Sequence, residues 1–263
     1  MQFTSINTSI IVGDLPLDEQ LALAASHGFT EVELWWPFET ANPTDDQVSG
    51  FLRTVEASGL ALIGLNLYEG GMAEGNRGIA CWPGFEQEMG DTVAVAKRIG
   101  LATGCRMFNV LNGTILPDVD RAEQDALAAA NTAYAAQELG AIGGTVTIEQ
   151  LSHIPGYGLR TAADVLGAIE RAVAVNGADN IRMQVDLFHM YNVGDDVPTF
   201  FDENWRVIGH VQVADEPGRG GPGTGSRPVI EHLERLRANG YTGRFTLEYS
   251  WAGPDGDPFG WMR

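Results

Sequence analysis

The chain has 263 residues, 44% of them hydrophobic and 19% charged, which is typical of a folded soluble protein rather than a disordered one. Its 35 acidic and 16 basic residues give a formal net charge of −19, which argues against nucleic acid and anionic membrane surfaces as partners. Two isolated cysteines, no signal-peptide pattern and no apolar run of membrane-spanning length together predict a cytoplasmic protein.

Apolar residues follow strand-like and helix-like spacings in alternation along the chain. Thr44 is placed to cap the start of a helix, and Gly28 and Gly59 follow helix ends, where a left-handed residue is common. In chain order we expect strand 3–7, helix 17–27, strand 30–35, helix 44–57, strand 61–67, helix 85–101, strand 106–111, helix 120–139, strand 145–149, helix 161–175, strand 181–186, short helix 198–203, strand 208–213, helix 228–239 and strand 245–248.

Strands that alternate with helices predict a parallel sheet with crossover helices, and eight such units across this length favour a closed (β/α)8 TIM barrel. No linker rich in Pro, Ser or charge divides the chain, so we expect a single domain over residues 1–263. An open sheet that binds a dinucleotide would carry G-x-G-x-x-G after its first strand, and nothing like it follows Asn7.

A glycine-rich loop, YEGGMAEGNRGIACWP, interrupts the pattern between residues 68 and 83. It is longer than a plain connector, which predicts a lid or a substrate-binding loop. Trp82 in this loop, together with Trp35 and Trp36, could line the mouth of the barrel, although burial in the barrel wall is the commoner fate of tryptophan.

Each of four consecutive strands carries an oxygen-bearing side chain near its carboxyl end, on the same face of the sheet. Glu149, Asp186, Gln212 and Glu248 each fall on the face opposite the apolar residues of their strand, so they should point into the barrel mouth. Active sites of TIM barrels lie at this end of the strands. Converging carboxylates repel one another unless a cation is present, and such hard oxygen ligands suit Mg²⁺ or Mn²⁺ better than zinc.

These segments resemble the hydroxypyruvate isomerase group of the xylose isomerase-like barrel superfamily, and the similarity spans essentially the whole chain. The matching stretches are GFTEVE at 28–33, the loop 66–80 with its E-G-N-R-G piece, IEQL at 148–151, QVDLFH at 184–189, GHVQVA at 209–214, PGR at 217–219 and LEY at 247–249.

The resemblance implies a divalent-metal enzyme that interconverts an aldose-like and a ketose-like small molecule. The metal, Mg²⁺ or Mn²⁺ with Co²⁺ as an alternative, would be bound by Glu149, Asp186, Gln212 and Glu248, and the two glutamates would transfer the proton. The expected substrate contacts are His189, His210, Arg219 and Asn66.

Arg219 could hold a substrate carboxylate from the loop, or it could be a surface residue that pairs with Asp215 or Glu216. Members of the group usually read P-G-R-x-E-P-x-x-G-E at this point, whereas Gly221 and Ser226 stand here in place of the acidic residues. This departure affects the expected choice of substrate or subunit contacts rather than the core chemistry.

The expected reaction is the conversion of hydroxypyruvate to tartronate semialdehyde (2-hydroxy-3-oxopropanoate), and assembly into a homo-oligomer is left open. A 2-oxo-tetronate isomerase and a ketose 3-epimerase are alternatives on the same scaffold, but the epimerases usually carry His where this chain has Gln212. A phosphodiesterase like endonuclease IV would need more histidines than five and a basic face. A non-catalytic sugar-binding barrel would not need both glutamates.

Overall fold

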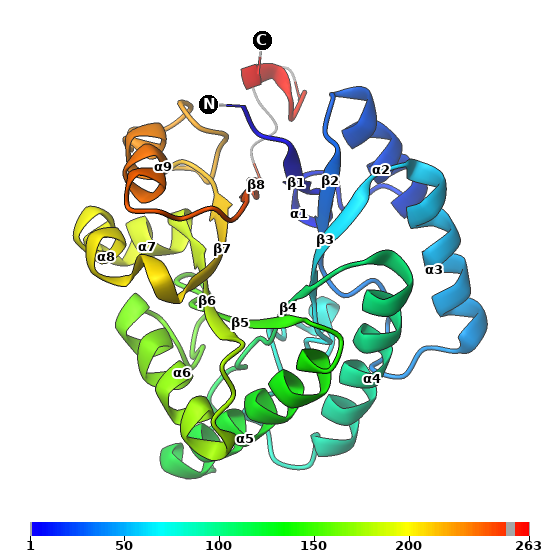
Figure 1. Ribbon diagram of the computed structural model, residues 1–263, viewed down its shortest axis with the longest axis vertical. Coiled ribbons are helices and arrows are strands. Elements are labelled where there is room, and N and C mark those ends of the chain that lie inside the picture. Colours follow the sequence, from blue (N-terminus) through cyan, green and yellow to red (C-terminus); the bar gives the residue numbers. More distant parts are fainter. Residues whose placement is uncertain (1, 251–255, 263) are drawn as a thin grey trace.

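The computed structural model describes residues 2–250 and 256–262, and these form a closed barrel of eight parallel strands in sequential order, β1 to β8. Figure 1 looks along the barrel, with the strands in the centre and the helices in a ring around them. The first and last strands close the barrel by pairing Ser5 with Thr246 and Ile6 with Leu247. The predicted (β/α)8 architecture is confirmed.

The observed bounds lie within two residues of every expected strand and helix. The strands are β1 Ser5–Asn7, β2 Glu31–Leu34, β3 Ala61–Asn66, β4 Met107–Asn109, β5 Thr145–Glu149, β6 Ile181–Asp186, β7 Ile208–Val213 and β8 Phe245–Leu247. The helices are α1 Thr8–Ile11, α2 Leu17–Ser26, α3 Asp45–Ser58, α4 Glu86–Thr103, α5 Arg121–Gly140, α6 Ala162–Asn176, α7 Leu187–Val193, α8 Val197–Asn204 and α9 Val229–Ala238, with short 3-10 turns η1 Met72–Glu74, η2 Trp205–Val207 and η3 Gly260–Met262.

The helix signals read from the sequence are present. Thr44 accepts a hydrogen bond from the Gln47 backbone in a capping box at the start of α3, and Gly59 ends the helix with a left-handed φ of 70°. The short helices α1 and α7 were not expected from the sequence, because neither is long enough to show a helical repeat of apolar residues. Asn7 caps α1 and Asp186 caps α7 through their side chains, so both helices begin directly from the ends of barrel strands.

Strand alternation separates an apolar outer face from a polar interior. Val146, Ile148, Met183 and Val185 are buried beneath the helices, as expected from their parity. The intervening side chains point inward and bond to one another across the barrel; for example, Thr147 donates to Gln184 at 3.1 Å. The interior is therefore packed with hydrogen-bonded polar groups, which are tolerated because they have partners.

The ring of helices is closed by the C-terminal segment, which lies between α9 and α2 in Figure 1. Phe259 stacks on His27 at the end of α2 with ring centroids 3.9 Å apart, and Trp261 packs edge-on against Tyr249. Within the described residues, η3 stands where a helix after β8 would otherwise cover the barrel.

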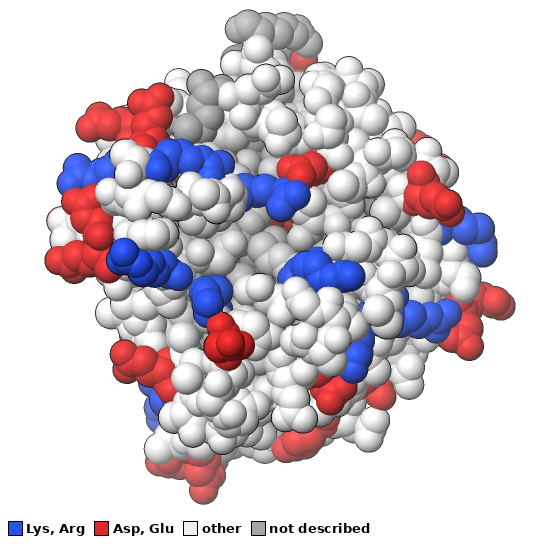
Figure 2. All heavy atoms as spheres, in the orientation of Figure 1, with Lys and Arg blue, Asp and Glu red and all other residues white. Residues whose placement is uncertain are grey.

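Charged side chains of both signs are scattered over the face seen in Figure 2. Several Lys and Arg side chains lie near its centre, whereas the Asp and Glu side chains lie mostly toward the rim. The net charge of −19 therefore does not make this face uniformly acidic. In the described part of the chain, no helix has both the length and the apolar character needed to cross a membrane.

Candidate active site

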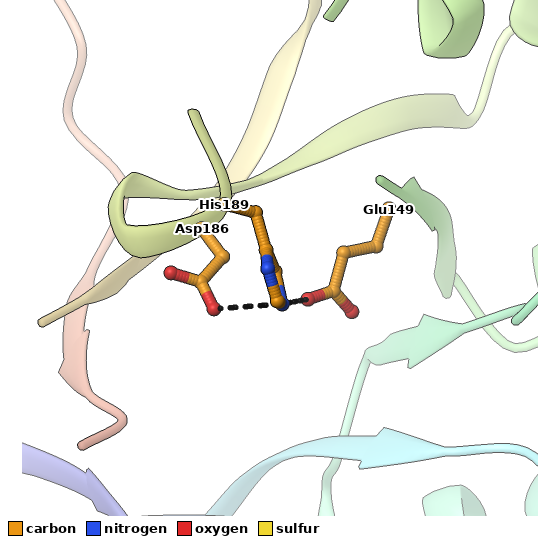
Figure 3. Close-up of side chains that lie close together, drawn as sticks. All are labelled: Glu149, Asp186 and His189. Atoms are coloured by element: carbon orange, nitrogen blue, oxygen red, sulfur yellow. Dashed lines mark ion pairs between the residues drawn. The ribbon is translucent and has the colours of Figure 1, made fainter. Parts of the chain in front are cut away.

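Three carboxylates converge at the carboxyl ends of the strands. Glu149, Asp186 and Glu248 come from β5, β6 and the residue after β8, and all three are buried. His189, on the first turn of α7, lies between the first two (Figure 3), with its Nε2 3.4 Å from Asp186 Oδ2 and 3.9 Å from Glu149 Oε1. Because Asp186 also caps α7, one residue both contributes a carboxylate and fixes the helix that carries the histidine.

Arg219 enters the same cluster from the loop after β7. Its Nη2 donates to Asp186 Oδ2 at 2.8 Å and to Glu248 Oε2 at 2.6 Å, and its guanidinium lies over the Phe188 ring. Arg219 has a φ of 49°, a left-handed conformation that costs energy for a residue with a side chain and is often found at functional sites. The surface alternative for Arg219 is wrong, because its side chain is 13% exposed and pairs with Asp186 and Glu248. Asp215 accepts from backbone N–H groups instead, and Glu216 pairs with Arg227.

Glu149 is held through one of its two carboxylate oxygens. Asn109 and Gln184 donate to Oε2 at 2.7 and 2.9 Å, whereas Oε1 faces His189. Burial, with the negative charge of Asp186 beside it, raises the pKa of Glu149 to about 8. Glu149 therefore combines a fixed orientation with a pKa near neutrality, which suits a group that both takes up and releases a proton.

Glu248 receives hydrogen bonds on both oxygens. Its Oε1 accepts from Asn7 at 2.9 Å, Gln212 at 3.0 Å and Trp35 at 3.3 Å, and its Oε2 accepts from Arg219. Burial and the neighbouring carboxylates nevertheless raise its pKa well above the ordinary value, against the opposing effect of Arg219. Glu248 is thus the more tightly held of the two glutamates.

Gln212 and His210 belong to a layer below the cluster. Gln212 Nε2 donates to both Glu33 and Glu248, and Gln212 Oε1 accepts from Gln184 at 3.0 Å. His210 Nε2 lies 2.6 Å from Glu33 Oε2. A direct substrate contact by His210 is therefore not part of this arrangement. Metal binding by Gln212 stays a prediction, and it requires the amide to turn so that its oxygen faces Glu248.

His189 is oriented as a hydrogen-bond donor. Its Nδ1 accepts from the Ser152 backbone N–H at 3.3 Å and lies 2.9 Å from Ser152 Oγ. Burial, with Arg219 and His153 nearby, lowers the pKa of His189 well below its usual range, so the neutral ring carries its proton on Nε2. That Nε2 is buried and has no hydrogen-bond partner among the described residues, which leaves it free to donate to a bound molecule.

A small cavity of about 70 Å³ opens onto the cluster. This volume is far below the roughly 300–1,000 Å³ of pockets that take drug-sized ligands, which points to a small substrate. A wider depression of about 870 Å³ lies alongside and shares Trp35 and Met72 with the cavity, but none of the three carboxylates lines it. The residues that line the small cavity are Trp35, Asn66, Met72, Arg77, Leu111, Glu149, Leu151, His153, His189, Arg219 and Glu248.

The cavity includes Asn66, Arg219, His189 and both glutamates among the expected site residues. Of the three tryptophans considered for the mouth, Trp35 lines the cavity, whereas Trp36 and Trp82 are buried. Sequence reasoning missed the residues that orient the cluster. These supporting residues are Asn7, Glu33, Asn109, Ser152 and Gln184. The one signal in the sequence is strand alternation, which places Glu33 and Gln184 on the inner face of the barrel with the residues they contact.

The donor set fits a divalent cation. Glu149, Asp186 and His189 each offer an atom within 4.8 Å of the others, so this buried group could hold a metal ion. With Glu33 and Glu248, four buried carboxyl groups face one guanidinium group and the His210 imidazole. A doubly charged ion would therefore reduce the repulsion among these groups without leaving an excess of positive charge.

Gly221, where the resemblance leads one to expect an acidic residue, has no room for a side chain. An added Cβ would lie 2.2 Å from the Trp261 ring, so the C-terminal segment occupies this space. Ser226, at the second altered position, donates its hydroxyl to the Glu216 carbonyl at 3.2 Å. The loop that carries Arg219 is thus packed against η3 in this chain.

The chain is a TIM barrel with a cluster of buried carboxylates at the carboxyl ends of its strands. Residues 21–263 match the xylose isomerase-like TIM barrel family. The chain is 30% identical to hydroxypyruvate isomerase of Escherichia coli, over 93% of this chain and 92% of that one. It is 30% identical to 2-oxo-tetronate isomerase of Cupriavidus necator, over 98% and 96%. A Streptomyces coelicolor relative, provisionally named a hydroxypyruvate isomerase, is 38% identical over 98% and 94%.

Among solved structures, a Brucella melitensis protein described as an AP endonuclease of family 2 has a TM-score of 0.87 and 28% identity, covering 100% of this chain and 98% of its own. The chain belongs to the xylose isomerase-like TIM barrel family and, within it, to the hydroxypyruvate isomerase group. It is an isomerase.

Proposed function

We propose that the protein is a metal-dependent isomerase of a small hydroxy-oxo acid, and that it interconverts hydroxypyruvate and 2-hydroxy-3-oxopropanoate. The observation that carries the proposal is the pair of buried glutamates, Glu149 and Glu248, that line one small cavity together with His189 and Arg219. The hydroxypyruvate isomerase and 2-oxo-tetronate isomerase relatives support the same class of substrate.

The reaction moves one proton between neighbouring carbon atoms. A proton leaves C3 of hydroxypyruvate to give an enediolate, and a proton is delivered to C2, while the hydroxyl proton passes from O3 to O2. Glu149 and Glu248 line the cavity from β5 and from the end of β8, so one carboxylate can take the proton from carbon and the other can return one. His189 Nε2–H donates to a substrate oxygen as negative charge develops there.

The residues that would hold the metal are Glu149, Asp186 and Glu248, with Gln212 if its amide turns. Bound there, Mg²⁺ or Mn²⁺ would act as a Lewis acid toward the substrate oxygens. Arg219 donates through one nitrogen to both Asp186 and Glu248, so its charge reduces the repulsion between these carboxylates and orients them. Asn109 and Gln184 keep one oxygen of Glu149 occupied, so its other oxygen faces the cavity.

The rival activities fit the site less well. A ketohexose for a 3-epimerase is a larger molecule than a cavity of about 70 Å³ favours. A phosphodiesterase like endonuclease IV would need a histidine-rich zinc cluster, and the metal-binding group found among the described residues contains one histidine. The net charge of −19 also opposes binding of DNA. Of the alternatives, a 2-oxo-tetronate isomerase is the most similar to the proposed activity, since its substrate is a hydroxy-oxo acid one carbon longer than hydroxypyruvate.

A substrate panel tests the proposal. Purified protein loaded with Mn²⁺ is expected to isomerise hydroxypyruvate with the highest kcat/KM, a 2-oxo-tetronate less efficiently, and C5–C6 ketoses poorly, because the cavity is small and carries guanidinium groups. Product formation is followed by NMR so that isomerisation and epimerisation are distinguished. A preference for neutral ketoses, with inversion at C3, would overturn the proposal in favour of the epimerase.

Metal binding is expected to strengthen as the pH rises. The pKa of Glu149, raised by burial and by Asp186 to about 8, means that binding a cation must displace a proton near neutrality. The proton is held more firmly in the folded protein than in the unfolded chain, so ionisation of Glu149 also lowers the stability of the metal-free fold as the pH rises from about 4.5 to about 8. Calorimetric titration with Mn²⁺ at pH 6, 7 and 8, in buffers of different ionisation enthalpy, measures both the affinity and the protons released. An affinity that does not change over this range would contradict the assignment.

A further inference from the structure

The glycine-rich loop after β3 brings a second guanidinium group into the active-site cavity. Arg77, in the E-G-N-R-G segment, lines the same cavity as Arg219 and the two catalytic glutamates. Across residues 2–250 and 256–262, Arg77 and Arg219 are the two Arg or Lys residues that line it. The reaction described above assigns no task to Arg77.

The backbone around Arg77 is held in place by the neighbouring strand end. Gly78 has a φ of 112° and bridges to Asn112, and an added Cβ at Gly78 would lie 2.2 Å from the Leu111 carbonyl oxygen. Gly78 N also donates to the Glu69 carbonyl at 2.9 Å. On the other side, the Asn76 side chain donates to the Gly70 carbonyl at 2.7 Å. The loop therefore presents Arg77 from a backbone that is already ordered, which lowers the entropy cost of binding a ligand there.

The two guanidinium groups differ in what they contact. Arg219 is bound to two buried carboxylates through one nitrogen, whereas the Arg77 side chain donates through Nη1 to the Asn76 carbonyl at 2.7 Å and to the Met72 carbonyl at 3.4 Å. No carboxylate of the described residues forms an ion pair with Arg77. Glu69 is near enough for its charge to act on Arg77, but its carboxylate accepts a hydrogen bond from the Met72 backbone N–H instead. Its charge is thus available to a bound anion, and an arginine keeps that charge at neutral pH.

A substrate that carries a carboxylate needs such a group. The cavity already contains Glu149 and Glu248, with Asp186 beside them, so an additional negative charge is repelled unless a cation meets it. A guanidinium group binds a carboxylate through two parallel hydrogen bonds, which fixes orientation as well as position. Arg219 was the residue expected from the sequence for this task. Its Nε has no partner among the described residues, but both two-pronged contacts of a guanidinium group also use Nη2, which Arg219 already shares between Asp186 and Glu248.

We propose that Arg77 is the residue that recognises the substrate carboxylate, and that it selects hydroxy-oxo acids over neutral ketoses. The proposal rests on the proposed function, because it presupposes an acid as the substrate. Arg219 then stays with Asp186 and Glu248, and Arg77 holds the carboxylate end of the substrate on the loop side of the cavity. The two carbons that exchange the proton are thereby directed toward the glutamates.

The test compares hydroxypyruvate with dihydroxyacetone, which has a CH₂OH group where hydroxypyruvate has its carboxylate. With the metal-loaded enzyme, Arg77→Gln is expected to raise KM for hydroxypyruvate by roughly 10–100-fold, the range for loss of a charged hydrogen-bonded pair, with kcat little changed. Its kcat/KM for dihydroxyacetone should not fall. Arg77→Lys, which keeps the charge but not the two-pronged geometry, should lie between the parent and Arg77→Gln.

Arg227→Gln is the matched control, since it removes one guanidinium group from the segment after β7 that does not line the cavity. It should leave both substrates unaffected. Calorimetric binding of glycerate to each variant provides a second measurement that does not depend on turnover. Glycerate should bind the parent and Arg227→Gln alike, and Arg77→Gln at least about tenfold more weakly.

The outcomes separate the two proposals. If the parent isomerises hydroxypyruvate and Arg77→Gln has the same KM, carboxylate recognition by Arg77 is wrong and the proposed function stands. If the parent does not act on hydroxypyruvate, the proposed function fails, and weaker glycerate binding by Arg77→Gln still decides in favour of Arg77 as an anion-binding residue. Equal losses for hydroxypyruvate and dihydroxyacetone would show a general effect on the loop and would overturn the inference.

Discussion

Glu149→Gln and Glu248→Gln are each expected to lower kcat by about 10²–10⁴-fold, the usual cost of removing a positioned acid or base. Glutamine keeps the shape of each side chain but cannot carry the proton. At Glu149 the new amide oxygen can still accept from Asn109 and Gln184, so the side chain should keep its place. When parent and variant are compared at the same Mn²⁺ occupancy, the loss of turnover at this position therefore reports proton transfer rather than a rearranged site or a missing ion.

The glutamine variant at Glu248 carries a further cost. Both oxygens of Glu248 accept hydrogen bonds, from Asn7, Trp35 and Gln212 on one side and from Arg219 on the other. An amide N–H2 group must then face at least one of these donors, so Glu248→Gln should also lower the melting temperature, whereas Glu149→Gln should do so less. Glu138→Gln, which removes the half-buried partner of Lys97, is the control for loss of a carboxylate outside the site.

Kinetics in deuterium oxide complete this test. If a carboxylate exchanges its proton with water during turnover, deuterium should appear on the carbon of the product in the parent protein. Either glutamine variant should lose exchange together with turnover while circular dichroism shows an intact fold. Full activity in one variant would remove that glutamate from the proton transfer and leave the other as the single acid–base group.

The sequence predicts well which strand residues point into the site, because this depends on the alternation of side chains along each strand. Glu149 and Asp186 each end a strand whose other face is apolar, and a parallel barrel brings such strand ends together whatever the loops do. The same parity places Gln212 inside the barrel, where it lies beside Glu248. These positions follow from local pattern and need no knowledge of distant contacts.

What the sequence does not give is the set of contacts made between distant segments. Arg219 reaches the carboxylates because one residue of a loop adopts a left-handed conformation, and no periodic pattern encodes that. No side chain fits at position 221, because the ring of Trp261, which is distant in the sequence, packs against Gly221. Likewise, strand parity predicts that His210 contacts the substrate, but its partner is Glu33 on a strand remote in sequence. The identity of each residue is visible in the sequence, whereas its partner is a property of the closed barrel.

Removal of the metal is expected to lower activity at least about a hundredfold, because Lewis-acid stabilisation is worth several kcal/mol and each 1.4 kcal/mol is a factor of ten. Protein dialysed against a chelator should regain activity with Mn²⁺, Mg²⁺ or Co²⁺. Ca²⁺, which prefers more ligands in a larger shell, should restore it poorly. Binding should also be visible without any assay of activity, as a rise in melting temperature that grows with Mn²⁺ concentration.

The physical reason is the buried charge. Glu149, Asp186 and Glu248 meet with a single guanidinium group among them. Burial raises the pKa of each, and repulsion by the neighbouring carboxylates raises the pKa of Glu149 and Glu248 further. A divalent ion removes that repulsion, so Asp186→Asn, which deletes one carboxylate but keeps the shape, should reduce the stabilisation by Mn²⁺. Ser226→Ala, in the loop but away from the carboxylates, serves as the control and should keep it in full. If protein shown by elemental analysis to be free of metal turned over substrate at the full rate, Glu149 and Glu248 would have to work without a cation, and the role given to the carboxylate cluster would be wrong.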